Sequence, residues 1–160
     1  MHCTLRPAVA TDAERIAAIL IDVRFAFMPY APLVHSAAEV RAWVREFLVP
    51  SGGIVVAESN GTVVGAVSTE RKDACSWITQ MAVDPAYVGN GIGSMLLQHV
   101  LGACPLPIRL HTFQANAGAR RFYERHGFRP TDFSDGQGNE ERCPDVLYEL
   151  AAAPRGRPDP

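Results

Sequence analysis

The sequence predicts an α/β fold with about seven strands and about four helices. Three observations indicate this class. An apolar strand at 77–83 runs through a glycine-rich turn into an apolar helix at 95–101. The Asn-Gly pair at 60–61 marks a tight hairpin between two strands, and two Ser/Thr-x-x-Glu boxes mark helix starts. We expect one domain over residues 1–150, because a chain of 160 residues has an ordinary length for a single domain.

The individual elements follow from apolar segments bounded by turn residues and capping signals. Strands are predicted at 3–8, 54–58, 63–69, 77–83, 107–113, 128–133 and 145–150. Helices are predicted at 11–27, 36–49, 95–101 and 116–126. The capping boxes are Thr11–Glu14 and Ser36–Glu39, and two prolines make 28–35 a loop between these helices. The Pro-rich segment 151–160 is expected to be a disordered tail.

Three glycines at alternating positions, Gly89, Gly91 and Gly93, follow the strand that ends at Val83. A helix N-terminus carries partial positive charge and unpaired N–H groups, so it suits an anion such as a pyrophosphate. Glycines let the backbone approach such a ligand with no side chain in the way. The spacing fits neither a Walker A loop, which needs a lysine after its glycines, nor a GxGxxG dinucleotide fingerprint. A phosphate-bearing cofactor is therefore predicted, and the alternative is a purely structural turn.

A second pattern lies downstream, after the next predicted strand. Asn116 suits a helix N-cap, and Gly127 suits the residue just past a helix end. The residues that share one face of this helix, at i, i+3, i+4 and i+7, are Asn116, Ala119, Arg120 and Tyr123. This face is therefore a candidate part of the same site.

Together the two patterns resemble the GCN5-related N-acetyltransferases. The resemblance rests on Val83-Asp84-Pro85 leading into Gly89-x-Gly91-x-Gly93, and on Asn116 with the run Phe122–Phe128. The order of elements agrees over roughly residues 3–150. The resemblance implies a mixed, mostly antiparallel central sheet flanked by helices. It also implies an enzyme that transfers an acetyl group from acetyl-CoA to a primary amine by direct attack in a ternary complex.

The resemblance also assigns roles to residues. The glycine loop would hold the pyrophosphate of acetyl-CoA, Asn116 would contact the cofactor, and Tyr123 would protonate the departing thiolate. Backbone N–H groups of the strand near Met81 would stabilise the negative charge that builds on the thioester oxygen. The implied cofactor-binding residues are Met81, Ala82, Val83, Val88, Gly89, Asn90, Gly91, Ile92, Gly93, Ser94, Asn116 and Ala119.

The chain departs from the family pattern at two places. Val88 stands where the family has a basic or amide side chain, so binding would rest more on backbone amides than on charge. Thr79 stands where relatives often carry a carboxylate, and a threonine cannot act as a base near neutral pH. By chemistry, His111 and His35 are the candidate bases, and a water chain with no single base is the alternative.

The acceptor is expected to be a small amine. The loop after the first helix brings Tyr30 and His35 toward the acceptor side in the family, and Trp77 and His111 are further candidates for that site. Acidic residues outnumber basic ones between 129 and 145, which would attract a cationic amine; the alternative is a solvated hairpin. No metal is expected, because the four cysteines are widely spaced and form no CxxC pair.

Composition excludes several other classes of function. Apolar residues make up 48% and charged residues 20% of the chain, and the formal net charge is −2. No basic run suggests a nucleic-acid or membrane partner, and the N-terminus lacks the apolar core of a signal peptide. We therefore expect a cytoplasmic protein, for which the resemblance is compatible with a homodimer. The competing hypotheses are a non-catalytic acyl-CoA-binding module on the same fold and an interaction domain with no cofactor.

Overall fold

The computed structural model describes residues 2–152, in two compact units. The first unit holds the chain up to Glu70 together with Ile78–Ala103. The second unit holds Arg71–Trp77 and the chain from Cys104 onward. Most of the predicted tail at 151–160 lies outside the described residues.

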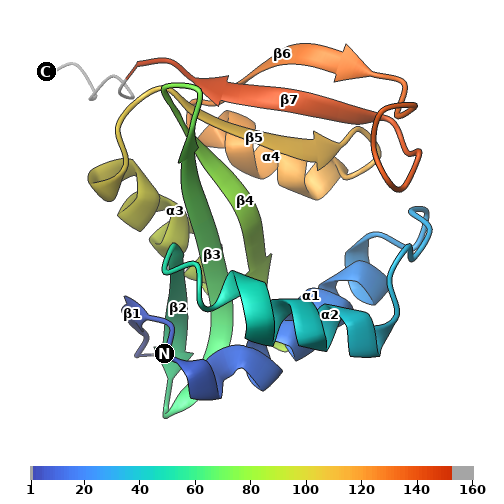
Figure 1. Cartoon of the computed structure of the whole chain (residues 1–160). Helices are drawn as coiled ribbons and strands as arrows, with labels where there is room; N and C mark the ends of the chain where they lie inside the picture. Colours follow the sequence, from blue (N-terminus) through green and yellow to red (C-terminus); the bar gives the residue numbers. More distant parts are fainter. Residues whose placement is uncertain (1, 153–160) are drawn as a thin grey trace, which may run out of the picture. The chain divides into compact units, whose positions relative to one another are not determined.

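One mixed sheet of seven strands has the order β1-β2-β3-β4-β5-β7-β6 (Figure 1). The strands are β1 (Thr4–Pro7), β2 (Ile54–Ser59), β3 (Thr62–Lys72), β4 (Cys75–Val83), β5 (Ile108–Phe113), β6 (Arg129–Ser134) and β7 (Asp145–Leu150). β4 and β5 run parallel, whereas β1–β2, β2–β3, β5–β7 and β6–β7 are antiparallel pairs. The α-helices are α1 (Ala13–Phe27), α2 (Ala37–Trp43), α3 (Ile92–Ala103) and α4 (Ala117–Arg125). The predicted fold class is confirmed.

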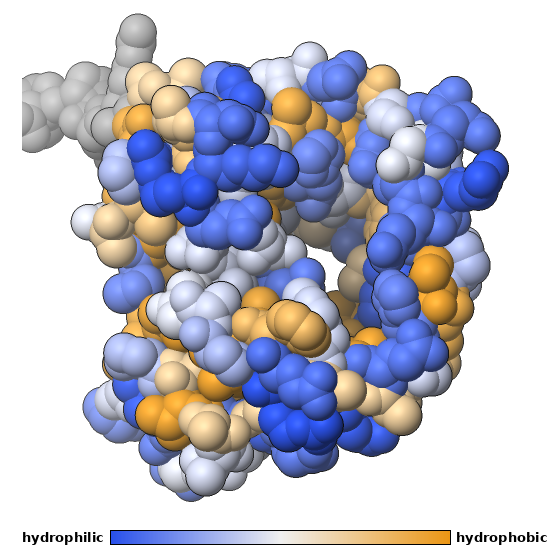
Figure 2. Space-filling view, viewed as in Figure 1, coloured by the Kyte–Doolittle hydropathy of each residue, from blue (hydrophilic) through white to orange (hydrophobic). Residues whose placement is uncertain are grey.

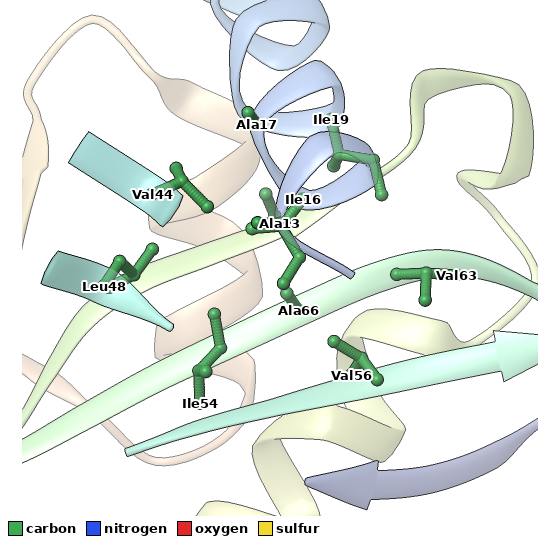
Figure 3. Packing of buried hydrophobic residues seen from close by; sticks show 11 residues of the cluster. Ala13, Ile16, Ala17, Ile19, Val44, Leu48, Ile54, Val56, Val63 and Ala66 are labelled. Atoms are coloured by element: carbon green, nitrogen blue, oxygen red, sulfur yellow. The ribbon is translucent and has the colours of Figure 1, made fainter. Parts of the chain in front are cut away.

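The core of the first unit lies between the helices α1 and α2 and the sheet. Ile16 and Ile19 of α1 meet Val44 and Leu48, which belong to a π-helical turn (η2, Val44–Leu48) that continues α2. These side chains point toward residues of β2 and β3, among them Val56 (Figure 3). The apolar side of α1 therefore faces the sheet.

The helix α3 packs on the opposite face of the same strands (Figure 1). A Cβ atom added to Gly65 of β3 would lie 3.1 Å from Ile92 Cγ2 and 3.2 Å from Leu96 Cδ1, so α3 approaches the strand closely there. Its neighbour Ala66 packs in the core beneath α1, and successive residues of a strand point to opposite faces. The start of α3 is thus fixed against the sheet by its own buried side chains.

Two predicted helix starts have different outcomes. Ser36 caps α2 as predicted, because its hydroxyl accepts a bond from the Glu39 amide at 3.1 Å. The box predicted at Thr11 is wrong, since a 3-10 turn (η1, Ala10–Asp12) precedes α1. There Asp12, not Thr11, accepts the free amide of Val9 at 2.8 Å. A carboxylate held by a nearby guanidinium replaces the hydroxyl that the pattern suggested.

In the second unit, α4 covers one face of β5, β7 and β6. Phe128 and Tyr148 are fully buried there, together with Ile108 and Leu110 of β5. The end of α4 is a Schellman motif: the amides of Phe128 and Gly127 donate to the carbonyls of Tyr123 and Glu124, each at 3.1 Å. Gly127 has a φ of 94°, which confirms the predicted helix end.

No helix among the described residues is long and apolar enough to cross a membrane. Apolar side chains on the face shown in Figure 2 lie between hydrophilic ones. Such scattered apolar residues are normal on protein surfaces and need no partner to explain them.

Candidate functional site

The glycine loop connects β4 to α3 within the first unit. Gly89 and Gly91 have φ angles of 90° and 79°, which L side chains rarely adopt. A Cβ atom added at either position would meet no atom within 4 Å, so both glycines face open space. The two glycines therefore expose a stretch of bare backbone, as the sequence predicted.

The N-terminus of α3 follows directly from this loop. The Met95 amide donates to the Gly91 carbonyl at 3.0 Å, which makes Gly91 the residue that precedes the first helical turn. The amides of Ile92, Gly93 and Ser94 have no carbonyl one turn earlier within the helix. Gly91 has no side chain with which to cap them, and no Lys or Arg occurs between 84 and 103. This segment therefore offers an anion its backbone amides and the helix dipole rather than a charged side chain.

Val88 and Asn90 complete the loop. Val88 is 53% exposed and offers no polar group, as the departure from the family pattern indicated. The Asn90 side chain donates to the Tyr87 carbonyl at 2.9 Å, so it braces the loop from within. Met81 to Val83 lie at the end of β4, beyond Ser76 and Trp77, where β4 pairs with β5.

The corner between β4 and the loop is held by Asp84, whose buried carboxylate has two partners. It accepts the Ala86 amide at 2.9 Å and a hydrogen bond from the guanidinium of Arg15 on α1. Arg15 also donates through Nε to the Val63 carbonyl at 2.9 Å. Sequence reasoning placed Asp84 only inside a motif and missed Arg15, because the two residues are 69 positions apart.

Asn116 and Tyr123 belong to α4 in the second unit. Asn116 is the N-cap, and its side-chain oxygen accepts the Ala119 amide at 3.2 Å. Tyr123 is 7% exposed and lies in an aromatic cluster with Phe122, Phe128 and Tyr148. Burial raises the pKa of the Tyr123 phenol well above its ordinary value, so the hydroxyl is protonated at neutral pH. Both the packing role and a proton-donor role are compatible with this environment.

Trp77 and His111 stack on each other on the sheet of the second unit. Their ring centroids are 5.5 Å apart, with an interplanar angle of 17°. Arg109 lies beside them: its guanidinium carbon is 6.0 Å from the Trp77 ring centroid, and its Nε donates to Glu149 at 2.6 Å. Within the described part of the chain, the buried indole nitrogen of Trp77 has no hydrogen-bond partner. These four side chains therefore form one aromatic and charged cluster.

The other acceptor-site candidates lie in the first unit. Tyr30 and His35 are exposed in the loop between α1 and α2, and His35 Nδ1 is 3.2 Å from the Glu39 carboxylate. The Thr79 hydroxyl donates to the Ser68 carbonyl at 3.2 Å, so it is engaged with the backbone. The described residues contain no group of three His, Cys, Asp or Glu that could hold a metal ion.

Solved structures share this fold across almost the whole chain. One is a GNAT-family acetyltransferase from Bacillus cereus, with 18% identity and a TM-score of 0.75, covering 97% of this chain and 100% of its own. Another is apo YjaB from Escherichia coli, with 22% identity, a TM-score of 0.76 and coverages of 95% and 100%. A third is PaiA N-acetyltransferase from Thermoplasma acidophilum in complex with coenzyme A, with 17% identity, a TM-score of 0.70 and coverages of 95% and 100%. No curated protein matches the chain in sequence.

The fold and the glycine loop define an α/β protein of the acyltransferase class. The model of the acetyltransferase (GNAT) family matches residues 20–128, which is more than half of the chain. The chain therefore belongs to the GNAT family of acetyltransferases. The resemblance drawn from the sequence is confirmed.

Proposed function

We propose that this chain transfers an acetyl group from acetyl-CoA to the primary amine of a small acceptor, by direct attack in a ternary complex. The observation that carries the proposal is the open, positive-φ backbone at Gly89 and Gly91, which leads into the uncapped start of α3. The family supports acetyl transfer, and its neighbour PaiA was solved with coenzyme A. A cytoplasmic location is part of the proposal.

The residues of the loop fit a pyrophosphate. The amides of Ile92, Gly93 and Ser94 lie at the positive end of the α3 dipole. The space around Gly89 and Gly91 would be filled by any side chain at these positions. When bound, acetyl-CoA supplies a thioester carbonyl that an amine can attack. The residues of the chain would hold the phosphates through these backbone amides.

Backbone amides at the end of β4 would stabilise the negative charge that builds on the thioester oxygen during acetyl transfer. Backbone amides at Met81 to Val83 lie beyond the stretch of β4 that pairs with β5. Amides fixed in a strand need no reorganisation when negative charge builds on an oxygen nearby. One such donor typically lowers the activation free energy by about 2.7–4 kcal/mol.

Tyr123 is the proposed proton donor. Its raised pKa keeps the proton on the phenol throughout the neutral range, so the donor is always loaded. The same burial makes the phenol a weaker acid than an ordinary tyrosine. Even an ordinary tyrosine, with a pKa near 10, is a weaker acid than a simple thiol, with a pKa near 8.5. Proton transfer would therefore require direct contact with the leaving sulfur rather than release to solvent.

The base and the acceptor contacts form the finer part of the proposal. The attacking amine must be neutral, so a group must take its proton or water must carry it away. His111 is exposed and held flat against Trp77, whereas His35 faces Glu39 through Nδ1. The buried Trp77 indole N–H is a donor for an oxygen of the acceptor if the stack opens. A water relay remains the alternative to either histidine.

A specific observation favours a second function, a non-catalytic acyl-CoA-binding module. The chain has Thr79 where relatives often have a carboxylate, and that hydroxyl is bonded to Ser68. This alternative predicts cofactor binding without turnover. Since the binding module has no turnover to lose, it also predicts that Tyr123→Phe behaves like the wild-type chain with acetyl-CoA.

Thermal unfolding with and without excess acetyl-CoA tests the proposal first. A ligand that binds only the folded state stabilises it by RT ln(1 + [L]/Kd), about 2.7 kcal/mol at 100 times Kd. We expect a clear rise in Tm, followed by thiol release from acetyl-CoA in a panel of primary amines. No shift at several millimolar acetyl-CoA would overturn the proposal and leave the glycines as a structural turn. A shift without thiol release for any amine would favour the binding module.

A further inference from the structure

Arg15 of α1 joins three elements of the first unit. Its Nε donates to the Val63 carbonyl on β3, and its terminal nitrogen Nη2 donates to the Asp84 carboxylate at the end of β4. A planar guanidinium can reach two acceptors in fixed directions, which an ammonium group cannot do. Arg15 is therefore a rigid strut between the first helix and the corner before the glycine loop.

A continuous path of hydrogen bonds leads from this strut into the loop. The Asp84 carboxylate accepts the Ala86 amide, and the Asp84 carbonyl accepts the Tyr87 amide at 2.8 Å. These bonds shape the 3-10 turn Pro85–Tyr87 (η3). The Tyr87 carbonyl in turn accepts the Asn90 side chain, next to Gly91. Each hydrogen bond of the path restricts the backbone conformation of the residues between its two partners.

We propose that Arg15 and Asp84 are a positioning pair, which holds the glycine loop in the shape that binds the pyrophosphate of acetyl-CoA. The inference rests on the proposed function. Neither side chain contacts the cofactor in this scheme; both act through the turn at 85–87. Glycines at 89 and 91 leave the loop with many accessible conformations, so its shape must be imposed from outside. Without the pair, the amides would lose alignment and the cofactor would bind less tightly.

The chain offers a matched pair for comparison. Arg6 bonds the Asp12 carboxylate at 2.8 Å, with side chains 35% and 9% exposed, against 34% and 12% for Arg15 and Asp84. Both aspartates also accept a backbone amide at a helical turn, from Val9 and from Ala86. Arg6 also donates to Glu58 at 2.7 Å, and its pair lies at the start of α1, the helix that carries Arg15, outside the path of hydrogen bonds from Asp84 to Asn90. A purely structural role predicts that the two pairs behave alike.

The test uses four variants of the full chain, each with a single substitution: Arg15→Gln, Arg15→Lys, Asp84→Asn and Arg6→Gln. CoA affinity is measured by titration calorimetry, and KM for acetyl-CoA, KM for the amine and kcat are measured separately. We expect Arg15→Gln and Asp84→Asn to raise Kd and KM for the cofactor roughly tenfold, because small misplacements of binding groups are costly. The amine KM and kcat at saturation should stay unchanged. Arg15→Lys keeps the charge without the fork and should lie between wild type and Arg15→Gln.

The signs of the two main substitutions separate positioning from simple attraction. Arg15→Gln removes a positive charge and Asp84→Asn removes a negative one. Attraction of an anionic cofactor through space would make Arg15→Gln bind less tightly and Asp84→Asn more tightly. Positioning makes both bind less tightly. Asp84→Asn also keeps an oxygen that can accept the Ala86 amide, so it gives a result even if Arg15→Gln fails to fold.

Three results would overturn the inference. The affinities could remain at the wild-type value, the two substitutions could have opposite signs, or Arg6→Gln could weaken CoA binding as much as Arg15→Gln. We expect Arg6→Gln to lower Tm and to leave Kd for CoA unchanged. A wild-type chain that binds no CoA would instead overturn the proposed function itself.

Discussion

The helices α3 and α4 each follow a strand of the sheet, yet they begin in opposite ways. At α4, Asn116 supplies a side-chain oxygen to the amide of Ala119. At α3, the preceding residue is Gly91, which has no side chain to offer. Free amides at a helix start are normally satisfied by a side chain, by water or by a ligand.

The start of α2 agrees with α4 rather than with α3, and before α1 a carboxylate bonds the amide that precedes the 3-10 turn. Ser36 caps α2, and Asp12 accepts the Val9 amide at the turn before α1. The start of α3 therefore lacks a side-chain cap, at a cost of only a few tenths of a kcal/mol, because glycine is well tolerated at the N-cap. In the proposed function, the amides at this start are the groups that bind the pyrophosphate of the cofactor.

The largest effect is expected from Gly91→Asp, which places a carboxylate at the start of α3. A fixed negative charge near 4 Å from a phosphate costs about 4 kcal/mol at an effective dielectric constant of 20. We therefore expect CoA binding to weaken by about 10³-fold, as measured by titration calorimetry. Gly91→Asn is the first control, because it places a side chain of the same size at the same φ of 79° without the charge. Gly102→Asp is the second, because it adds the same charge near the other end of α3. A loss for Gly91→Asp no larger than in both controls would remove the start of α3 from the site.

The second prediction concerns the chemistry assigned to α4. Tyr123→Phe should lower kcat by about a hundredfold, the lower end of the range for one positioned acid, because burial makes this phenol a weak donor. CoA affinity should stay unchanged, since the cofactor phosphates are assigned to the glycine loop and the start of α3 rather than to Tyr123. Tyr148→Phe is the matched control: it removes a buried phenol that accepts a bond from Arg120 at 3.0 Å. It should lower Tm and leave kcat intact.

Local signals predicted much of the fold and the backbone geometry of the glycine loop. Asn60 and Gly61 both have positive φ angles, as the hairpin signal required. Asn116 and Gly127 mark the ends of α4, and Gly89 and Gly91 are the exposed backbone that their spacing suggested. Each of these features depends on residues a few positions apart. Short-range patterns record such features directly.

Long-range contacts could not be predicted in the same way. The bond between Arg15 and Asp84 spans 69 positions and exists only after α1 has packed on β3. Thr11 had the better capping pattern, yet Asp12 holds the turn because Arg6, on the adjacent strand, fixes its carboxylate. In both cases an arginine from another element decides which acid acts. A single sequence contains no signal for that choice.

The third prediction separates the two roles of Asn116. Asn116→Ala removes the cap and should lower the free energy of unfolding by about 1 kcal/mol. Asn116→Asp keeps the oxygen that accepts the Ala119 amide, so stability should be close to wild type. It removes the amide N–H₂ donor, so CoA affinity should fall several-fold if Asn116 touches the cofactor. Urea unfolding and calorimetry measure the two effects separately. Wild-type affinity in both variants would limit Asn116 to capping.

The smallest effect concerns the start of α1, where a charged group does the capping. Hydrogen bonds from Arg6 lower the pKa of Asp12, and the Val9 amide adds to this. A pKa depressed in the folded state stabilises the fold above the unfolded value near 3.9, and this stability is lost as the pH falls below it. Asp12→Asn should therefore cost about 0.5–1 kcal/mol at pH 7, a modest value because Arg6 is partly exposed, and progressively less as the pH falls below about 3.9 and through the lowered pKa of the folded state. Glu14→Gln, at an exposed position of the first turn of α1, removes only a weak pair with Arg41 and should change the free energy of urea unfolding by a few tenths of a kcal/mol or less at pH 7. An Asp12→Asn protein that loses as much stability at pH 3 as at pH 7 would show that the cap, not the charge, stabilises this helix start.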